Sequence, residues 1–194
     1  MKQKDFKEIV AKNRSYRRFY QDHEIGLETL RGLVDLARLT PSAANRQSLR
    51  YIISQRPEKN GLIFQYIAWA AYLADWLGPG EGERPTAYII ILNDTNISKT
   101  IDCDHGIAAQ TILLGATDMG LGGCMIASIK KEGLRAALTI PANFDILLVI
   151  ALGKPKEKVV IESVPPTGEI RYWRDDKNVH HVPKRSLDDL LLDL

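Results

Sequence analysis

A short basic segment near the N-terminus could bind phosphate. Arg14-Ser15-Tyr16-Arg17-Arg18 places three guanidinium groups and a serine hydroxyl within five residues. The planar guanidinium fork matches the oxygens of a phosphate and can bind them bidentately. A solvated basic face has the same composition, so the segment alone leaves both interpretations open.

A second candidate is the polar loop Pro41-Ser42-Ala43-Ala44-Asn45-Arg46-Gln47. The side chains of Ser42, Asn45 and Gln47 offer hydrogen-bond donors and acceptors close to a backbone of small residues. This combination suits the edge of a heteroaromatic ring. A capped turn uses the same residue types, because Ser and Asn are routine loop residues.

Two further segments complete the candidates. Gly120-Leu121-Gly122-Gly123-Cys124-Met125-Ile126-Ala127-Ser128 joins glycines, which allow close backbone approach, to an apolar run that could line a flat ligand. It is not the dinucleotide fingerprint G-x-G-x-x-G, and a tight turn between helix and strand explains it equally well. Pro183-Lys184-Arg185 could complete an anion site or merely solubilise the end of the chain.

Other kinds of site lack their motifs. The histidines show no zinc-ligand spacing, and the sequence contains neither a G-x-S-x-G elbow nor a Walker loop. His180 and His181 would point to opposite sides of an extended segment, and we expect them on the surface. Cys124 is expected to be a buried small residue and not a nucleophile. We therefore assign no metal ligand and no catalytic acid, base or nucleophile.

Hydrophobic periodicity and chain breakers predict the elements that position these segments. The predicted helices are Phe6 to about Asn13, Leu27–Arg38, Gly61–Leu77, Asp104–Met119 with Asp104 as its cap, and Lys130–Leu138. The predicted strands are Arg50–Ser54, Ala87–Leu92 closed by Asn93-Asp94, Cys124–Ala127 and Phe144–Leu152. Residues 78–85 are predicted to form a loop and residues 120–123 a turn. Helices mixed with short strands indicate one layered α+β domain.

The chain changes character after Gly153. The remaining residues are charged and rich in proline, with little periodicity before Leu187–Leu192. About forty residues without a core pattern are unusual inside a compact domain. Either this tail is disordered or it packs along something large, for which a partner subunit is the candidate.

The composition excludes several classes. A chain of 194 residues, 45% hydrophobic and 26% charged, suits one soluble domain. Its 26 basic and 24 acidic residues nearly cancel, which argues against a general nucleic-acid binder. Two cysteines favour a reducing compartment, and the N-terminus lacks the apolar region of a signal peptide. The most apolar predicted helix is too short to span a bilayer comfortably, so we expect a cytoplasmic protein.

In this order, the segments resemble the nitroreductase family. Its pattern runs R-x-S-x-R, P-S-x-x-N-x-Q, a G-L-G-x-C-type turn, a G-K-P strand exit and a basic K-R before a short C-terminal helix. These stand here as Arg14 to Arg17, Pro41 to Gln47, Gly120 to Cys124, Gly153-Lys154-Pro155 and Lys184-Arg185. The resemblance covers nearly the whole chain, although no single motif is specific.

The resemblance implies a three-layer α-β-α sandwich with a mixed central sheet. Residues 1–194 would form one FMN-binding domain whose residues 153–194 wrap the partner subunit of a homodimer. Arg14, Ser15 and Arg17 would hold the phosphate of FMN, helped by Lys184 and Arg185. Ser42, Asn45 and Gln47 would contact the flavin of the other protomer. The residues implied along the isoalloxazine are Met125, Ile126, Ala127 and Ser128, with a backbone N–H near N5.

This sequence departs from the family in two places. Relatives usually continue the polar loop with Pro and Trp, where Ser48 and Leu49 stand here. Many relatives also have an Asn and a Lys or Arg near the end of the long central helix, and residues 76–84 give no match. No residue is therefore assigned to the substrate side of the flavin.

The implied activity is transfer of a hydride from NADH or NADPH through FMN to a small organic acceptor, of the nitroaromatic or quinone type, by a ping-pong mechanism. The cofactor supplies the chemistry and the protein supplies position and electrostatics. Three alternatives stay open: a specialised flavin enzyme such as a reductive dehalogenase, a flavin carrier or sensor without turnover, and a protein without cofactor. No segment indicates a 2′-phosphate site, so neither nucleotide is favoured.

Overall fold

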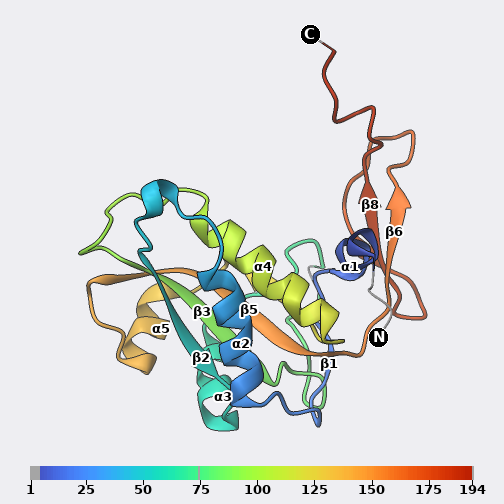
Figure 1. Ribbon diagram of the computed structural model, residues 1–194. Helices are drawn as coiled ribbons and strands as arrows, with labels where there is room; N and C mark the ends of the chain where they lie inside the picture. The colour runs from blue at the N-terminus through green and yellow to red at the C-terminus, as the bar shows by residue number, and fades with distance from the viewer. Residues whose placement is uncertain (1–4, 74, 194) are drawn as a thin grey trace.

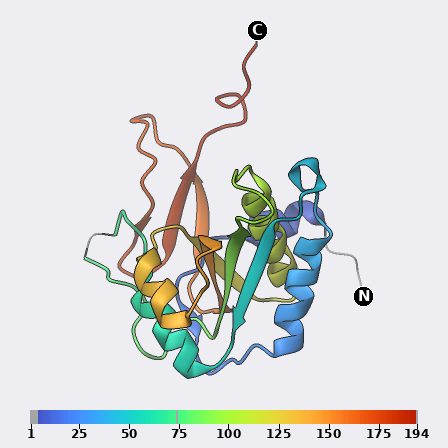
Figure 2. The same ribbon diagram turned by 90° about the vertical axis from the view of Figure 1, so that its left-hand side faces the viewer.

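The computed structural model describes residues 5–73 and 75–193. A central sheet lies between two helical layers, and a small separate sheet stands to one side (Figures 1 and 2). The helices are α1 (Phe6–Lys12), α2 (Leu27–Arg38), the 3-10 turn η1 (Ala43–Asn45), α3 (Pro57–Gln65), α4 (Asp104–Asp118) and α5 (Lys131–Leu138). The strands are β1 (Phe19–Tyr20), β2 (Leu49–Ser54), β3 (Ala87–Asp94), β4 (Gly122–Ile126), β5 (Phe144–Pro155), β6 (Val159–Ser163), β7 (Trp173–Arg174) and β8 (His180–Lys184). This architecture confirms the predicted α+β three-layer sandwich.

The long strand β5 organises the central sheet. The order is β1-β5-β3-β2, and β4 pairs with β5 as well. All pairings between these named strands are antiparallel. The expected mixed central sheet therefore needs correction: among the described residues, the parallel pairing next to this sheet is an isolated bridge between Ser15 and Gly123.

The two faces of the sheet are covered by different helices. Ile89 and Ile91 of β3 pack with the α2 and α4 layer, whereas Tyr88 and Ile90 pack with the α3 and α5 layer. Successive strand residues point to opposite faces, so a strand covered on both sides must be apolar throughout. Every residue of β3 is buried accordingly.

The helix predicted at residues 61–77 is wrong in both bounds. The observed α3 begins earlier, at Pro57, and ends at Gln65. The chain leaves the helix because Ile67 forms a β-bridge with Ile129 and the Ala68 N–H donates to the Ser128 carbonyl at 2.9 Å. The predicted range is apolar apart from Gln65 and Asp75, so its composition does not show this end. Ala74, within the predicted range, lies outside the described residues.

The start of α4 also differs from the prediction. Cys103 is its N-cap residue, and Asp104 is already helical. The Asp104 carboxylate accepts hydrogen bonds from the loop at Ser42 and Ala43 instead of capping its own helix. No helix among the described residues combines the length and apolar character needed to cross a membrane.

The tail is ordered by its own sheet. Strand β8 pairs with β6 in parallel and with β7 in antiparallel register. Residues 187–190 form a turn, closed by a hydrogen bond from the Leu190 N–H to the Leu187 carbonyl, and not the short helix of the family pattern. Beyond β8 the chain points away from the main body in both views (Figures 1 and 2).

Candidate functional site

The basic segment lies against the glycine turn predicted as a separate candidate. The Tyr16 N–H donates to the Gly123 carbonyl at 3.0 Å, beside the bridge between Ser15 and Gly123. A Cβ at the neighbouring Gly122 would lie 2.5 Å from Cδ2 of the Tyr16 ring, so this close approach favours glycine at residue 122. Two candidate segments, distant in sequence, thus meet at the start of β4.

A cavity of about 350 Å³ opens beside this contact. Its lining is Asn13, Arg14, Ser15, Arg17, Tyr172, His180, Val182 and Lys184. Three cations and no carboxylate stand among these eight residues, and such a wall favours an anion. The structure therefore brings together four of the five residues predicted to hold a phosphate.

Arg17 is the central cation of this cavity. Its side chain is buried, with 9% of the residue exposed. One Nη1 atom lies 3.3 Å from both the Ser15 carbonyl oxygen and His180 Nε2, and Cζ lies 4.9 Å from the ring centroid of Tyr172. All three partners are neutral, and within the described part of the chain the guanidinium has no ion pair. A buried charge without an opposite charge is costly, so an anionic ligand is the expected counterpart.

The hydrogen bonds of Glu157 explain why this carboxylate does not form an ion pair with the Arg17 side chain. This carboxylate, whose side chain is fully buried, accepts hydrogen bonds from the backbone N–H groups of Arg17 and Arg18. Its second oxygen binds Nη2 of Arg174 at 2.9 Å. Glu157 thus joins the tail to the basic segment while the Arg17 side chain stays directed elsewhere.

Two arginines lie outside the cavity lining: Arg18, which follows the predicted Arg17, and the predicted Arg185. Arg18 forms a two-point pair with Glu83, at 2.5 and 2.7 Å. This hydrogen bonding lowers the pKa of Glu83 to about 2. Arg185 is exposed after β8 and does not line the cavity. Of the two cations predicted in the tail, the structure places only Lys184 at the site.

Hydrogen bonds within the polar loop and to Asp104 of α4 fix the conformation of the loop. The Ser42 hydroxyl donates to Asp104 at 2.7 Å and accepts from the Gln47 N–H at 3.0 Å. Ala44, Asn45 and Gln47 have φ near +50°, a region that residues other than glycine seldom occupy. The Ser42 side chain is thus committed to the loop, and Asn45 and Gln47 are the exposed polar groups.

We expect Asp104→Ala to loosen this loop. The carboxylate accepts from Ser42 Oγ and the Ala43 N–H, and a hydrogen bond to a charged group contributes about 1.5–3 kcal/mol. Urea denaturation should show a loss of that order, and amide exchange should rise at residues 42–47. Asp102→Ala is the matched control, since the Asp102 pair with Arg46 is exposed. Equal protection of the loop in all three proteins would contradict the assignment.

The end of β4 divides between core and surface. Ile126 is 4% exposed within the core, so only its backbone could face a ligand. Met125 is half-buried, and Ala127 and Ser128 are exposed. Cys124 is buried as predicted, and burial raises the pKa of its thiol.

Sequence reasoning missed part of the cavity. His180, expected on the surface, is 1% exposed, so that expectation is wrong. His181 does lie on the other side of β8, where it stacks on Trp173. Strand alternation was the signal that could have found His180. Residues two apart in a strand share a face, so a strand ending at Lys184, a predicted phosphate ligand, would place His180 on the same face as Lys184.

The polar loop and the basic cavity lie apart in one chain. Figure 1 shows η1 and the tail sheet beyond opposite ends of α4. This helix has 15 residues, which corresponds to roughly 22 Å at the usual rise. One chain therefore does not bring all the predicted cofactor residues together.

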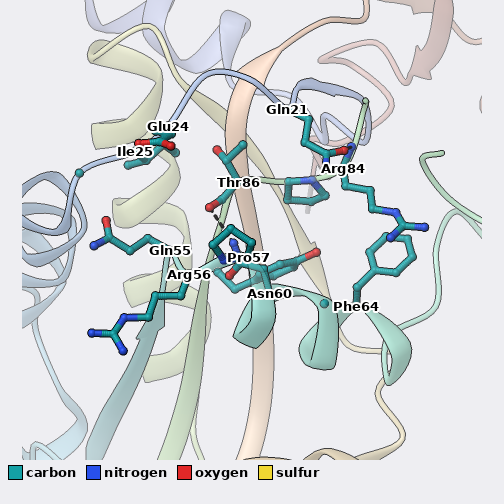
Figure 3. A pocket seen from close by; sticks show the side chains of 14 residues that line it. Gln21, Glu24, Ile25, Gln55, Arg56, Pro57, Asn60, Phe64, Arg84 and Thr86 are labelled. Carbon is teal, nitrogen blue, oxygen red and sulfur yellow. Dashed lines mark hydrogen bonds between the residues drawn. The ribbon is translucent and has the colours of Figure 1, made fainter. Parts of the chain in front are cut away.

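A second cavity, of about 400 Å³, lies at the N-terminal end of α3 and includes none of the predicted residues. Figure 3 shows Arg84 over the ring of Phe64, with Cζ 4.6 Å from the ring centroid. Glu24 and Arg56 also line it, so its charges have both signs. It lacks the single sign of charge that distinguishes the first cavity.

The sandwich and the cation-lined cavity define the class of the protein: a three-layer α+β domain with a candidate anion site. The chain belongs to the nitroreductase family, whose model matches residues 10–154. A provisionally named NADH dehydrogenase/NAD(P)H nitroreductase of Methanothermobacter thermautotrophicus is 31% identical, over 79% of this chain and 78% of that protein. Mouse iodotyrosine deiodinase 1 is 21% identical, over 99% and 70%. The structure of an FMN-dependent nitroreductase from Clostridium difficile superposes with a TM-score of 0.65 at 23% identity, over 77% and 87%.

Proposed function

We propose that this protein is an FMN-dependent oxidoreductase that passes a hydride from NADH or NADPH to a small organic acceptor of the nitroaromatic or quinone type. The observation that carries the proposal is the buried Arg17 guanidinium, which has no ion pair within residues 5–73 and 75–193 and lies in a cavity with Arg14 and Lys184. Arginine and lysine are the usual ligands of a phosphate monoester. The family match supports the redox chemistry.

The residues of the cavity fit the phosphate end of FMN. Arg14, Arg17 and Lys184 would supply charge, and Ser15 would supply a hydroxyl, with the exposed Arg185 nearby in sequence. The Nε atom of Arg14 is buried and has no hydrogen-bond partner in the part of the chain that the structure describes, so it is an unsatisfied donor beside the cavity. Bound FMN would supply two-electron transfer between the nucleotide and the acceptor.

The remaining contacts would come from the end of β4 and from a second protomer. Ala127 and Ser128 are exposed there and would lie along the flavin ring with Met125 and the backbone of Ile126. Asn45 and Gln47, in the loop shaped by Ser42, would reach the flavin of the partner, because one chain holds its own loop away from its own cavity. The proposed compartment is the cytoplasm, where NADH and NADPH are present.

We therefore expect a homodimer. A complete site needs the cavity of one copy and the polar loop of another, and residues 153–194 are proposed to lie at the interface. Sedimentation should give about twice the mass of one 21.8 kDa chain. A monodisperse monomer that still binds FMN tightly would contradict the shared site.

An absorption spectrum of the purified protein tests the proposal directly. We expect flavin bands that bleach when NADH or NADPH is added without oxygen, and parallel double-reciprocal lines in steady state. Flavin that does not bleach would favour a carrier or another reductant. A colourless protein that takes up no added FMN would refute the proposal.

A second acceptor class is a halogenated phenol. The mouse relative is named as a deiodinase and matches 99% of this chain. Halide release from a model iodophenol with dithionite-reduced protein would support it. Reduction of a quinone without halide release would favour the first class.

A further inference from the structure

Behind Arg17 lies a neutral set of side chains that the cofactor assignment does not use. His180 Nε2 lies 3.3 Å from Arg17 Nη1, and the Tyr172 ring lies under Cζ of the same guanidinium. The rings of Tyr172 and His180 are 5.2 Å apart, and that of Tyr72 contacts Tyr172 at 5.0 Å. Arg17 is thus contacted from two directions, by the buried His180 of β8 and by the half-buried Tyr172 just before β7.

The contact with the Arg17 guanidinium determines which ring nitrogen of His180 carries the proton. A guanidinium can only donate, so Nε2 must be the acceptor and the proton must reside on Nδ1. Nδ1 is buried and has no partner among the described residues. A protonated ring would set an N–H group and a positive charge against Arg17.

The surroundings keep this imidazole neutral. Burial, together with the positive charges of Arg17, Arg174 and His181, lowers the pKa of His180 to about 4. The nearby carboxylate of Glu157 is occupied by Arg174 and by backbone N–H groups, and those of Glu162 and Asp175 contact His181. At neutral pH, His180 is therefore a fixed acceptor.

We propose that His180 is a positioning residue, which holds the Arg17 guanidinium where it meets the phosphate of FMN and thereby favours FMN over riboflavin. This inference rests on the proposed function, because it takes the cavity as the phosphate site. Tyr172 completes the arrangement by supporting the guanidinium face. A mobile arginine side chain loses rotamer freedom when it binds a ligand, and this loss of entropy weakens binding. The Arg17 side chain is already held in place before binding, so this cost is smaller.

The test compares flavin affinities by fluorescence titration in wild type, His180→Phe and His180→Gln. Phenylalanine removes the acceptor, and glutamine keeps one that does not titrate. We expect His180→Phe to weaken FMN binding about tenfold and to leave riboflavin binding unchanged. His180→Gln should retain most of the wild-type affinity for FMN. His181→Gln is the matched control and should bind FMN as wild type does.

A double-mutant cycle separates positioning from general damage. In an Arg17→Ala background, His180→Phe should have no further effect on FMN affinity, because its effect passes through Arg17. A loss of the same size in both backgrounds, or an equal loss for riboflavin, would overturn the inference. If the wild-type protein binds no FMN, both the proposed function and this inference are overturned. If it binds FMN and the His180 substitutions leave the affinity unchanged, only this inference is overturned.

Two measurements do not depend on the folding of His180→Phe. Nitrogen NMR of labelled histidine should find His180 neutral with its proton on Nδ1 at pH 6, and the opposite tautomer or a cation would overturn the inference. The sign of the pH effect also follows: between pH 6.5 and about 4 the unfolded chain binds a proton at His180 that the folded chain excludes. Wild type should therefore lose unfolding free energy relative to His180→Gln as the pH falls through this range.

Discussion

Arg17→Ala is expected to weaken FMN binding by about 1.5–3 kcal/mol, which corresponds to roughly 10- to 150-fold in the dissociation constant. The guanidinium is buried in a cavity of like charges and would make a charge-assisted hydrogen bond to the phosphate. Alanine removes both the charge and the donors. Titration of apoprotein with FMN, followed by the quenching of flavin fluorescence, measures the change.

Two further variants calibrate this result. Arg185→Ala should weaken FMN binding less, because Arg185 is exposed and lies outside the cavity lining. Arg38→Ala, in an exposed pair on α2, should bind FMN as wild type does. If Arg17→Ala and Arg185→Ala both retain FMN as tightly as wild type, the phosphate lies elsewhere.

Glu157→Leu is expected to produce the largest loss of stability, of about 3–5 kcal/mol in the free energy of unfolding. The carboxylate is fully buried, and its loss leaves Arg174, 11% exposed at its side chain, without an opposite charge. It also leaves the backbone N–H groups of Arg17 and Arg18 without their acceptor. Urea denaturation followed by circular dichroism measures the change.

The control for Glu157 is a carboxylate of the same tail in solvent. Glu169→Leu removes an exposed pair with Arg171 and should leave the denaturation midpoint unchanged, since exposed pairs contribute little. We also expect Glu157→Leu to lose FMN affinity, because the same carboxylate holds the backbone of Arg17. A Glu157→Leu protein as stable as Glu169→Leu would show that this contact does not fasten the tail.

Local patterns predicted most of the elements because those elements are amphipathic or clearly bounded. Helix α2 begins and ends at the predicted residues, with Leu30, Leu33 and Ala37 on its buried face. Strand β3 was evident as a continuous apolar run, which a sheet covered on both faces requires. The prediction for α3 failed because residues 61–77 are apolar apart from Gln65 and Asp75 and so show no helix end. The helix ends at Gln65, and contacts with Ser128 and Ile129 follow directly.

The sequence by itself determined the family pattern, the three-layer fold and the types of residue that could hold a phosphate. Arg14, Ser15, Arg17 and Lys184 were identified in this way. Only the tertiary structure decided which of these cations meet and which are neutralised. The Arg17 side chain has no ion pair among the described residues, because Glu157, 140 residues away, binds the Arg17 backbone and not its side chain. No local pattern encodes that choice, because the residue that contacts the guanidinium, His180 of β8, lies 163 residues further along the chain.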